Sequence, residues 1–356
     1  MARHIVAIGQ LPPPFNGFSL ATRSMIALLE EGNSVTSRNV SPPFGKLSLL
    51  KHPIKLSRVL RACRQLFRDR KHDNRICYLA CEGGRGLLYT ALIVLVARLL
   101  AYPIYLHHHS FSYIGRTSLL MRCVLAFGGS RLRHIFLCDV MRDSFTDTYE
   151  RRMRSNIVSN AAFVVPTEQN GAPQYRTTLV IGMLSNLTTE KGLDTFLDLT
   201  RQARHESLPV RAILAGPAGG PGERAAIDAA VMEVGDALDY RGALYDDAKA
   251  AFYREIDVFV LPTAYGNEAQ PLVIFEAKAA GSAVISTDRG CIRKQLDEND
   301  LLAPADDEFV PTALAWLSVM APGLELDARR GVIRQAYRAR HAKARAAVNA
   351  LFDLEE

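Results

Sequence analysis

The sequence predicts an α/β protein of two doubly wound domains, each a parallel sheet covered by helices on both faces. Short apolar runs alternate with helix-like segments through the first half of the chain, a pattern typical of βαβ units. A polar segment at 167–178, with glycine and proline, interrupts the pattern, which then starts again. The length of 356 residues also exceeds what one hydrophobic core usually supports. We expect the two domains to face each other across a cleft at the carboxyl ends of their strands, where ligands bind in open α/β proteins.

The first domain is predicted to span 1–170 and to open with a buried strand at 4–9. Its other strands are predicted at 76–80, 104–108, 134–138 and 162–166, and its helices at 20–30, 87–100 and 119–126. The first of these helices is closed by Gly32, a residue that commonly follows a helix end. The polar segment then supplies a linker at 171–178.

The second domain, 179–330, repeats this alternation. Its strands are predicted at 179–184, 211–216, 238–241, 258–262 and 283–287, and its helices at 191–205, at 225–234, at 248–256 and after Pro271. Proline is favoured at the first helical position, so we expect the last of these helices to begin at Pro271. A helix at 331–356 ends the sequence, and packing back on the first domain is one arrangement open to it.

The composition is that of a folded protein without a membrane span. The N-terminal residues lead directly into an apolar strand rather than a secretory signal, and the most apolar stretch, 87–97, is too short to cross a bilayer. The six cysteines lack the paired spacing of a zinc site, and we expect them to be reduced thiols. We therefore expect a cytoplasmic protein.

The net charge of +6 is unevenly distributed, with a basic segment between Lys46 and Arg75. Its cations, among them Arg61, Arg64 and Arg68, alternate with apolar residues at helical spacing. Such a helix fits an anionic membrane surface, a phosphate-bearing acceptor or simple exposure to solvent, and the sequence does not separate these roles. Nucleic acid is a weaker candidate because no aromatic residues interleave with the charge.

The most informative segment is NEAQPLVIFEAKAAGSAVIST, in which Glu268 and Glu276 lie eight positions apart. Glu268 falls in a polar loop after the strand-like run IDVFVLP, and Glu276 falls inside the following helix. This spacing directs two carboxylates and the free N–H groups of a helix start toward one volume. Carboxylates accept hydrogen bonds from hydroxyls, and a helix start binds phosphate. The segment therefore predicts a site for a nucleotide sugar.

The same segment resembles the E-x7-E block of retaining glycosyltransferases of family 4, and the preceding DVFVLPTAYG resembles the strand and loop that lead into it. IGMLSNLTTEKGLDTFLDL is similar to the start of that family's second domain. The loop PPPFNGF and the strand end IYLHHHSF fall where the family has a glycine loop and a donor-site histidine. The resemblance extends at intervals from residue 5 to about residue 292, and it implies the GT-B fold.

The resemblance implies roles for residues of the second domain. Lys191, which precedes a glycine at a helix start, would hold the donor diphosphate. Glu276 would accept hydrogen bonds from the ribose hydroxyls, and Glu268 would orient the hexose hydroxyls and favour positive charge on the sugar carbon. Similar proteins often carry an arginine about five residues before the lysine, but Ser185 and Asn186 occupy that stretch here. Their hydrogen bonds would then replace one charge, or another cation would supply it.

Two further features bear on the diphosphate. The candidates for the missing cation are Arg289 and Arg293. The glycine pair usual in the family is also altered, and Pro271 has no N–H to offer. Any backbone donor to phosphate is then expected from Gln270, Leu272 or Val273.

The first domain offers a loop and a histidine. Asn-Gly readily adopts positive φ, so Asn16 and Gly17 fit either a close backbone approach to the sugar or leaving phosphate, or a turn alone. His107 and His109 share one face of a strand and His108 the other. The resemblance implies that His109 contacts the donor sugar.

We expect no metal ion and no cofactor. A histidine pair without an identifiable third ligand does not make a metal site, and no Asp-x-Asp occurs in the chain. The glycines of the N-terminal loop do not form G-x-G-x-x-G, which removes the best evidence for a nicotinamide dehydrogenase.

The sequence thus favours a retaining, metal-independent hexosyltransferase. It would move a hexose from a nucleotide diphosphate sugar, held mainly by the second domain, to a hydroxyl of a glycan or lipid-linked saccharide approaching from the first. Two other functions stay open. One is a nucleotide-sugar epimerase of the same fold, which would need an acid and a base in the cleft. The other is a non-catalytic nucleotide- or carbohydrate-binding protein, which the missing arginine would suit.

Overall fold

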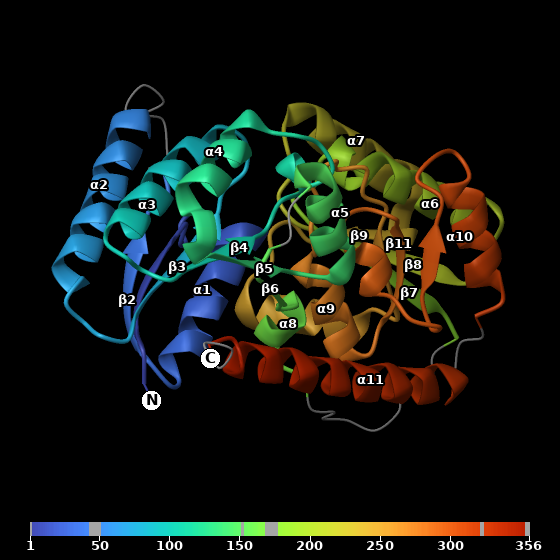
Figure 1. Ribbon diagram of the computed structural model, residues 1–356. Coiled ribbons are helices and arrows are strands. Elements are labelled where there is room, and N and C mark those ends of the chain that lie inside the picture. The colour runs from blue at the N-terminus through green and yellow to red at the C-terminus, as the bar shows by residue number, and fades with distance from the viewer. Residues whose placement is uncertain (1, 43–50, 151–152, 168–176, 321–323, 353–356) are drawn as a thin grey trace. The chain divides into compact units, whose positions relative to one another are not determined.

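The computed structural model describes residues 2–42, 51–150, 153–167, 177–320 and 324–352 (Figure 1). The chain forms two compact units. The first comprises Met1–Phe163 and Ala344–Glu356, and the second comprises Val164–Lys343. Each unit contains its own six-stranded sheet, and every strand pair in both sheets is parallel.

The first unit is built around a sheet with the strand order β2-β1-β3-β4-β5-β6. The strands are β1 His4–Gly9, β2 Ser34–Asn39, β3 Arg75–Cys81, β4 Ile104–His108, β5 Leu132–Phe136 and β6 Ser155–Ile157. The α-helices are α1 Gly17–Glu30, α2 Lys51–Asp69, α3 Leu87–Leu99, α4 Leu119–Gly128 and α5 Asp139–Tyr149. Helices α2, α3 and α4 lie side by side along the sheet (Figure 1). Strand β4 is buried along its whole length, as expected for a central strand of a parallel sheet.

The second unit has the strand order β12-β11-β10-β7-β8-β9. The strands are β7 Leu179–Leu184, β8 Val210–Ala215, β9 Leu238–Tyr240, β10 Val258–Leu261, β11 Ala283–Thr287 and β12 Leu301–Ala303. The α-helices are α6 Leu193–His205, α7 Pro221–Val234, α8 Asp246–Glu255, α9 Leu272–Ala280, α10 Phe309–Ser318 and α11 Leu324–Asn349. The last turns of α11 belong to the first unit.

Both faces of the second sheet are buried at its central strands, which are mostly apolar. In β7, Leu179, Ile181 and Met183 belong to one core cluster, whereas Val180 belongs to another. Successive side chains of a strand point to opposite faces, so each cluster lies on one side of the sheet. This arrangement leaves the carboxyl ends of the strands as the edge where loops can build a site.

The predicted fold class is confirmed, and most elements lie within a few residues of their predicted bounds. The strand predicted at 162–166 is wrong, because Asn160–Phe163 form a 3-10 helix and the edge strand is Ser155–Ile157. Val165 is 76% exposed, so this apolar run was not a buried strand. The helix predicted from Pro271 begins one residue later, since Pro271 is its extended N-cap with ψ 126°. Of the predicted linker 171–178, positions 171–176 lie outside the described residues, as does Lys46 of the basic segment.

Within the described residues, no helix is both long enough and apolar enough to cross a lipid bilayer. The cysteines Cys63, Cys77, Cys81 and Cys123 are free thiols. The expectation of reduced thiols is therefore confirmed at these four positions. It is wrong at Cys138 and Cys291, which are disulfide-bonded.

Candidate functional site

The central feature of the second unit is an ion pair between Lys191 and Glu268. Lys191 ends the 3-10 turn Thr189–Lys191 that follows β7, and Glu268 lies in the loop after β10. The Lys191 Nζ donates to Glu268 Oε2 at 2.6 Å, and their side chains are 25% and 10% exposed. The hydroxyl of Thr263 also donates to Glu268 Oε2, at 3.4 Å. Because β7 and β10 are neighbours in the sheet, residues 77 positions apart meet at its carboxyl edge.

A glycine fixes the lysine in this position. Gly192 has φ +87°, and a Cβ built on it would lie 2.2 Å from the carbonyl oxygen of Pro262. Only glycine combines that backbone conformation with so close an approach. The backbone N–H of Ala264 also donates to the carbonyl of Glu190 at 2.9 Å. The loops after β7 and β10 are therefore held together by backbone contacts, and the ion pair does not depend on its own attraction alone.

A second glycine brings the loop after β11 against Glu268. Gly290 has φ +55°, and a Cβ there would lie 2.2 Å from the carbonyl oxygen of Glu268. The next N–H, of Cys291, donates to the carbonyl of Ala269 at 2.7 Å. Arg289 immediately precedes this glycine, and its buried Nε has no hydrogen-bond partner among the described residues. Arg293, in contrast, is 61% exposed and pairs with Asp288 at 2.6 Å.

Glu276 lies on α9, and each of its carboxylate oxygens accepts a hydrogen bond from another side chain. Its Oε1 accepts from Lys249 Nζ at 2.6 Å and its Oε2 from the hydroxyl of Tyr253 at 2.8 Å. Burial raises the pKa of Tyr253 well above its ordinary value, so this hydroxyl remains a donor. Each carboxylate oxygen has a second lone pair that a ligand hydroxyl can use. The Glu276 side chain is 20% exposed.

The sequence analysis missed Lys249 and Tyr253. Their spacing of four residues on α8 places them on one face of that helix, which was a usable signal. Their pairing with Glu276 is a tertiary contact between α8 and α9, however, and no local pattern specified it.

The remaining predicted residues of this unit lie along the same edge of the sheet. Ser185 is half-buried and its N–H donates to Ala215, while Asn186 is exposed. Gln270 is 5% exposed. Leu272 is the first residue of α9, and no side chain caps that helix start, so its first N–H groups are available to an anion.

In the first unit, Asn16 is the N-cap of α1. Its side chain accepts from the Ser19 N–H at 2.9 Å, and the Ser19 hydroxyl accepts from the Asn16 N–H at 3.2 Å, which completes a capping box. Gly17 begins the helix and is not among the positive-φ glycines, so the expectation of positive φ there is wrong. A Cβ on Gly17 would meet nothing within 4 Å. The space above this backbone is open.

The predicted alternation of the three histidines is confirmed. The rings of His107 and His109 lie 4.0 Å apart between centroids, whereas His108 stacks on His134 on the other side. The Nε2 atoms of His107 and His109 are both buried without a hydrogen-bond partner among the described residues. The ring of Phe18 lies 5.4 Å from that of His109, so the start of α1 and the end of β4 come together.

Burial lowers the pKa of His109 to about 3. Its ring is therefore neutral at physiological pH. A neutral imidazole both donates and accepts one hydrogen bond, which suits contact with a sugar hydroxyl rather than with a phosphate.

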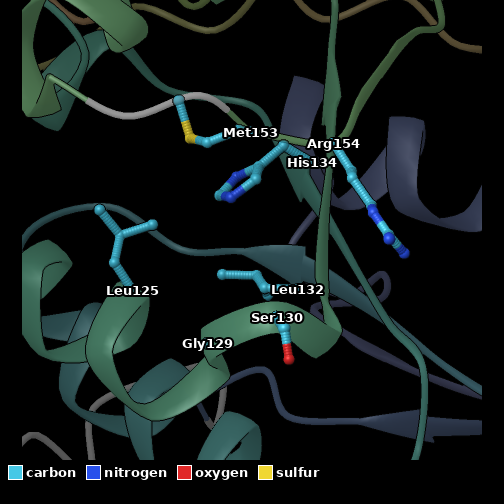
Figure 2. Close-up of a pocket in the computed structure, with 7 residues that line it drawn as sticks. All are labelled: Leu125, Gly129, Ser130, Leu132, His134, Met153 and Arg154. Atoms are coloured by element: carbon cyan, nitrogen blue, oxygen red, sulfur yellow. The ribbon is translucent and has the colours of Figure 1, made fainter.

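A separate pocket of about 360 Å³ lies in the first unit and is shown in Figure 2. It is lined by Leu125, Gly129, Ser130, Leu132, His134, Met153 and Arg154. None of the predicted site residues lines it, and we assign it no part in the candidate site.

The two parallel six-stranded sheets with helices define an α/β protein with the GT-B fold. Anabaena HepE in complex with UDP superposes with a TM-score of 0.68 over 99% of this chain and 98% of that chain, at 15% identity. The OtsA apo structure superposes with a TM-score of 0.68 over 100% and 99%, at 13% identity. Identities this low establish the fold alone.

Residues 178–318 match the family model described as glycosyl transferases group 1. This part of the chain is therefore similar to group 1 glycosyltransferases, in agreement with the resemblance found in the sequence. The phosphatidyl-myo-inositol mannosyltransferases of Mycobacterium tuberculosis and Mycobacterium bovis are each 26% identical over 185 residues, covering 51% of this chain and 46% of theirs. The chain thus spans about half the length of the curated relatives it matches.

Proposed function

We propose that this chain is a retaining, metal-independent hexosyltransferase. It takes a hexose from a nucleotide diphosphate sugar and joins it to a hydroxyl of a glycan or lipid-linked saccharide. The observation that carries the proposal is the Lys191–Glu268 pair at the carboxyl edge of a group 1 glycosyltransferase domain. Anabaena HepE was solved with UDP and with UDP-glucose, and the curated relatives are mannosyltransferases, which supports a hexose donor.

In this proposal the second unit binds the donor. Glu276 accepts the ribose hydroxyls through the lone pairs that Lys249 and Tyr253 leave available. Lys191 and the uncapped N–H groups at the start of α9 hold the diphosphate, since a helix start and an ammonium both favour a phosphate. Glu268 then orients the hexose hydroxyls and favours positive charge on the sugar carbon.

Arg289 is our candidate for the second cation on the diphosphate. The residue after it, Gly290, packs against the backbone of Glu268. The Nε of Arg289 is buried and has no hydrogen-bond partner among the described residues. Arg293 is less suitable because Asp288 already neutralises it. We expect Arg289→Lys to retain more donor affinity than Arg289→Met, and Arg293→Met to retain all of it. Equal affinity of wild type and Arg289→Met would assign the charge to Lys191 alone.

Fixed charges replace a metal ion and a protein nucleophile in this scheme. Departure of the diphosphate and attack by the acceptor hydroxyl on the same face of the sugar retain the anomeric configuration. The bond from the sugar carbon to the diphosphate oxygen breaks, the bond to the acceptor oxygen forms, and the hydroxyl proton passes to the departing diphosphate. The positively charged transition state is stabilised by Glu268, and the leaving diphosphate by Lys191 and Arg289. In the first unit, the neutral ring of His109 and the open backbone at Gly17 supply contacts to the sugar.

We further propose that α2 docks the protein on an anionic membrane, where a lipid-linked acceptor would be found. The outward residues Leu56, Leu60 and Phe67 are 43%, 54% and 53% exposed. They fall on one helical stripe, which the exposed Arg64 and Arg68 flank. Exposed apolar residues beside arginines are the composition of an interfacial helix.

Two other cations of α2, Lys55 and Arg58, have internal partners and are left out of this docking face. Lys55 pairs with Glu82, and Arg58 donates to the carbonyl of Ser41. Sedimentation with anionic vesicles tests the proposal. Leu60→Glu with Phe67→Glu should abolish binding, whereas Met232→Glu, an equally drastic change at an 87% exposed residue of α7, should not. Absence of wild-type binding at low salt would exclude this role.

The proposed activity is tested by incubating the purified chain with a panel of labelled nucleotide sugars and membranes. Label transferred to lipid or glycan supports the hexosyltransferase. An epimerised donor would assign the chain to the epimerases instead, and donor binding without either product would make it a binding protein. Omitting divalent cations from the assay tests metal independence, and the anomeric proton coupling of the product tests retention.

A further inference from the structure

The first unit contains a cluster of side chains that can ligate a metal ion, at the opposite edge of the sheet from His109. It consists of His4, Asp69 and His72. Their ligating atoms all lie within 4.8 Å of one another. His4 is the first residue of β1, Asp69 the last of α2, and His72 lies in the turn that follows. Because β1 and β4 run parallel in one sheet, this cluster lies at the amino edge and His109 at the carboxyl edge.

The donor set and its spacing fit a late divalent transition metal. His4 Nε2 lies 2.9 Å from Asp69 Oδ2. In a tetrahedral site with bonds of about 2.1 Å, ligand atoms are roughly 3.4 Å apart, so a cation could bind both without moving either backbone. The ring of His72 stacks on that of His4 with centroids 4.0 Å apart. His72 is exposed, so its ring can rotate to direct a nitrogen at the same point.

The backbone around the three residues is fixed. The N–H of His4 donates to Asn74 at 3.0 Å, and the N–H of His72 donates to Asp69 at 3.1 Å. Gln65 donates to both carboxylate oxygens of Asp69, at 3.0 and 2.9 Å. Such outer partners orient ligands in metal sites. The cluster is therefore preorganised except for the His72 ring.

The charge pattern of α2 also points to a cation here. Asp69 is the only acidic residue of that helix, and it occupies the last turn, where the helix dipole disfavours a negative charge and favours a positive one. Two neighbouring cations, Arg70 and Arg75, lie over aromatic rings instead of facing Asp69. Arg70 lies over the ring of Phe67 at 3.8 Å, and Arg75 over that of Tyr102 at 5.3 Å.

We propose that His4, Asp69 and His72 bind one divalent transition-metal ion of the zinc class, with solvent completing the coordination. Two imidazoles and a carboxylate suit Zn²⁺, Co²⁺ and Ni²⁺ better than Mg²⁺ or Ca²⁺, which prefer oxygen ligands. The ion clamps the beginning of β1 to the end of α2. It stabilises the first unit and takes no part in glycosyl transfer, so the proposal is independent of the proposed function.

The test uses the full chain without an affinity tag, freed of metal by a chelator. Titration with Zn²⁺ against a chromophoric chelator should give one site per chain, and Co²⁺ should give visible d–d absorption. His72→Ala is expected to weaken Zn²⁺ binding at least tenfold and to abolish the rise in Tm that Zn²⁺ causes. His205→Ala removes a matched exposed histidine at a helix end and should change neither.

Two outcomes would overturn the proposal. One is Zn²⁺ binding of equal affinity in wild type and His72→Ala. The other is no binding of Zn²⁺, Co²⁺ or Ni²⁺ to the wild type at micromolar concentration. Because His72 is exposed, its removal should leave the fold intact. Asp69→Asn, which keeps the shape of the side chain and removes its charge, gives a second variant with the same expected loss.

Discussion

Replacing Glu268 by glutamine is expected to tighten nucleoside diphosphate binding while abolishing transfer. In the free protein Lys191 is neutralised by Glu268 at 2.6 Å, so an incoming diphosphate must compete for the ammonium. Glutamine still accepts a hydrogen bond but no longer holds the charge. Partly exposed ion pairs contribute about 1 kcal/mol, which corresponds to roughly fivefold tighter binding. Transfer should nevertheless fail, because the carboxylate proposed to stabilise positive charge at the sugar carbon is gone.

Replacing Glu276 by glutamine should instead weaken the binding of a nucleoside diphosphate. Glu276 already has Lys249 and Tyr253 as partners, and its remaining lone pairs are proposed to accept ribose hydroxyls. A hydrogen bond to a charged group contributes about 1.5–3 kcal/mol, so losing one such bond weakens binding about ten- to a hundredfold. Glu255→Gln is the control, since Glu255 also pairs with basic residues, at 2.6 Å from Arg241, but has no proposed contact to the donor.

Calorimetry with UDP and GDP measures these affinities, and urea denaturation of each variant verifies that the fold is kept. Weaker binding in Glu268→Gln would refute the competition between Glu268 and the diphosphate. Equal affinity of wild type, Glu276→Gln and Glu255→Gln would refute the placement of the ribose.

Three further predictions test other parts of the site. Lys191→Met should weaken binding of a nucleoside diphosphate much more than binding of the nucleoside, because the ammonium meets only the diphosphate; calorimetry showing equal losses would contradict this role. Gly17→Val should leave the Tm unchanged, since a Cβ at Gly17 meets nothing within 4 Å, yet abolish transfer; full turnover would mean that no ligand approaches that backbone. The pKa of His109 is about 3 in the folded protein against an ordinary 6.5, so its contribution to stability is present above pH 6.5 and is lost as the pH falls toward 3. At pH 5 that loss amounts to about 2 kcal/mol, and His109→Asn should reduce the decrease in unfolding free energy between pH 7.5 and pH 5 by this amount; urea denaturation showing an unchanged decrease would contradict a buried neutral ring.

Much of the fold could be predicted because most of its central strands are apolar and buried on both faces. Strand β7, with Leu179 and Ile181 on one face and Val180 on the other, is such a case. Strand β2, SVTSRN, escaped prediction because it lies at the sheet edge and is largely polar and partly exposed. The false strand at 162–166 shows the converse, since Val165 is apolar but 76% exposed. Apolar runs predict burial, and only burial by neighbouring elements makes a strand.

The candidate site was less predictable because its contacts join residues distant in the sequence. That Lys191 and Glu268 have a functional role was expected from a resemblance. Their direct pairing depends on β7 and β10 being sheet neighbours and on Gly192 fitting against Pro262. The partners of Glu276 were missed for the same reason, since α8 and α9 meet only in the folded chain.

The pairing of charges has a consequence for how such a site stays stable without its ligand. Two carboxylates and two ammonium groups at one edge of a sheet would be costly if each were left unpaired and partly buried. The fold pairs them, Lys191 with Glu268 and Lys249 with Glu276, and both pairs keep some contact with solvent. A bound diphosphate would exchange one partner of Lys191 for another rather than create a new buried charge. In the proposed scheme the free protein therefore resembles the bound state in its charge balance, and binding of the diphosphate releases the Glu268 carboxylate from Lys191.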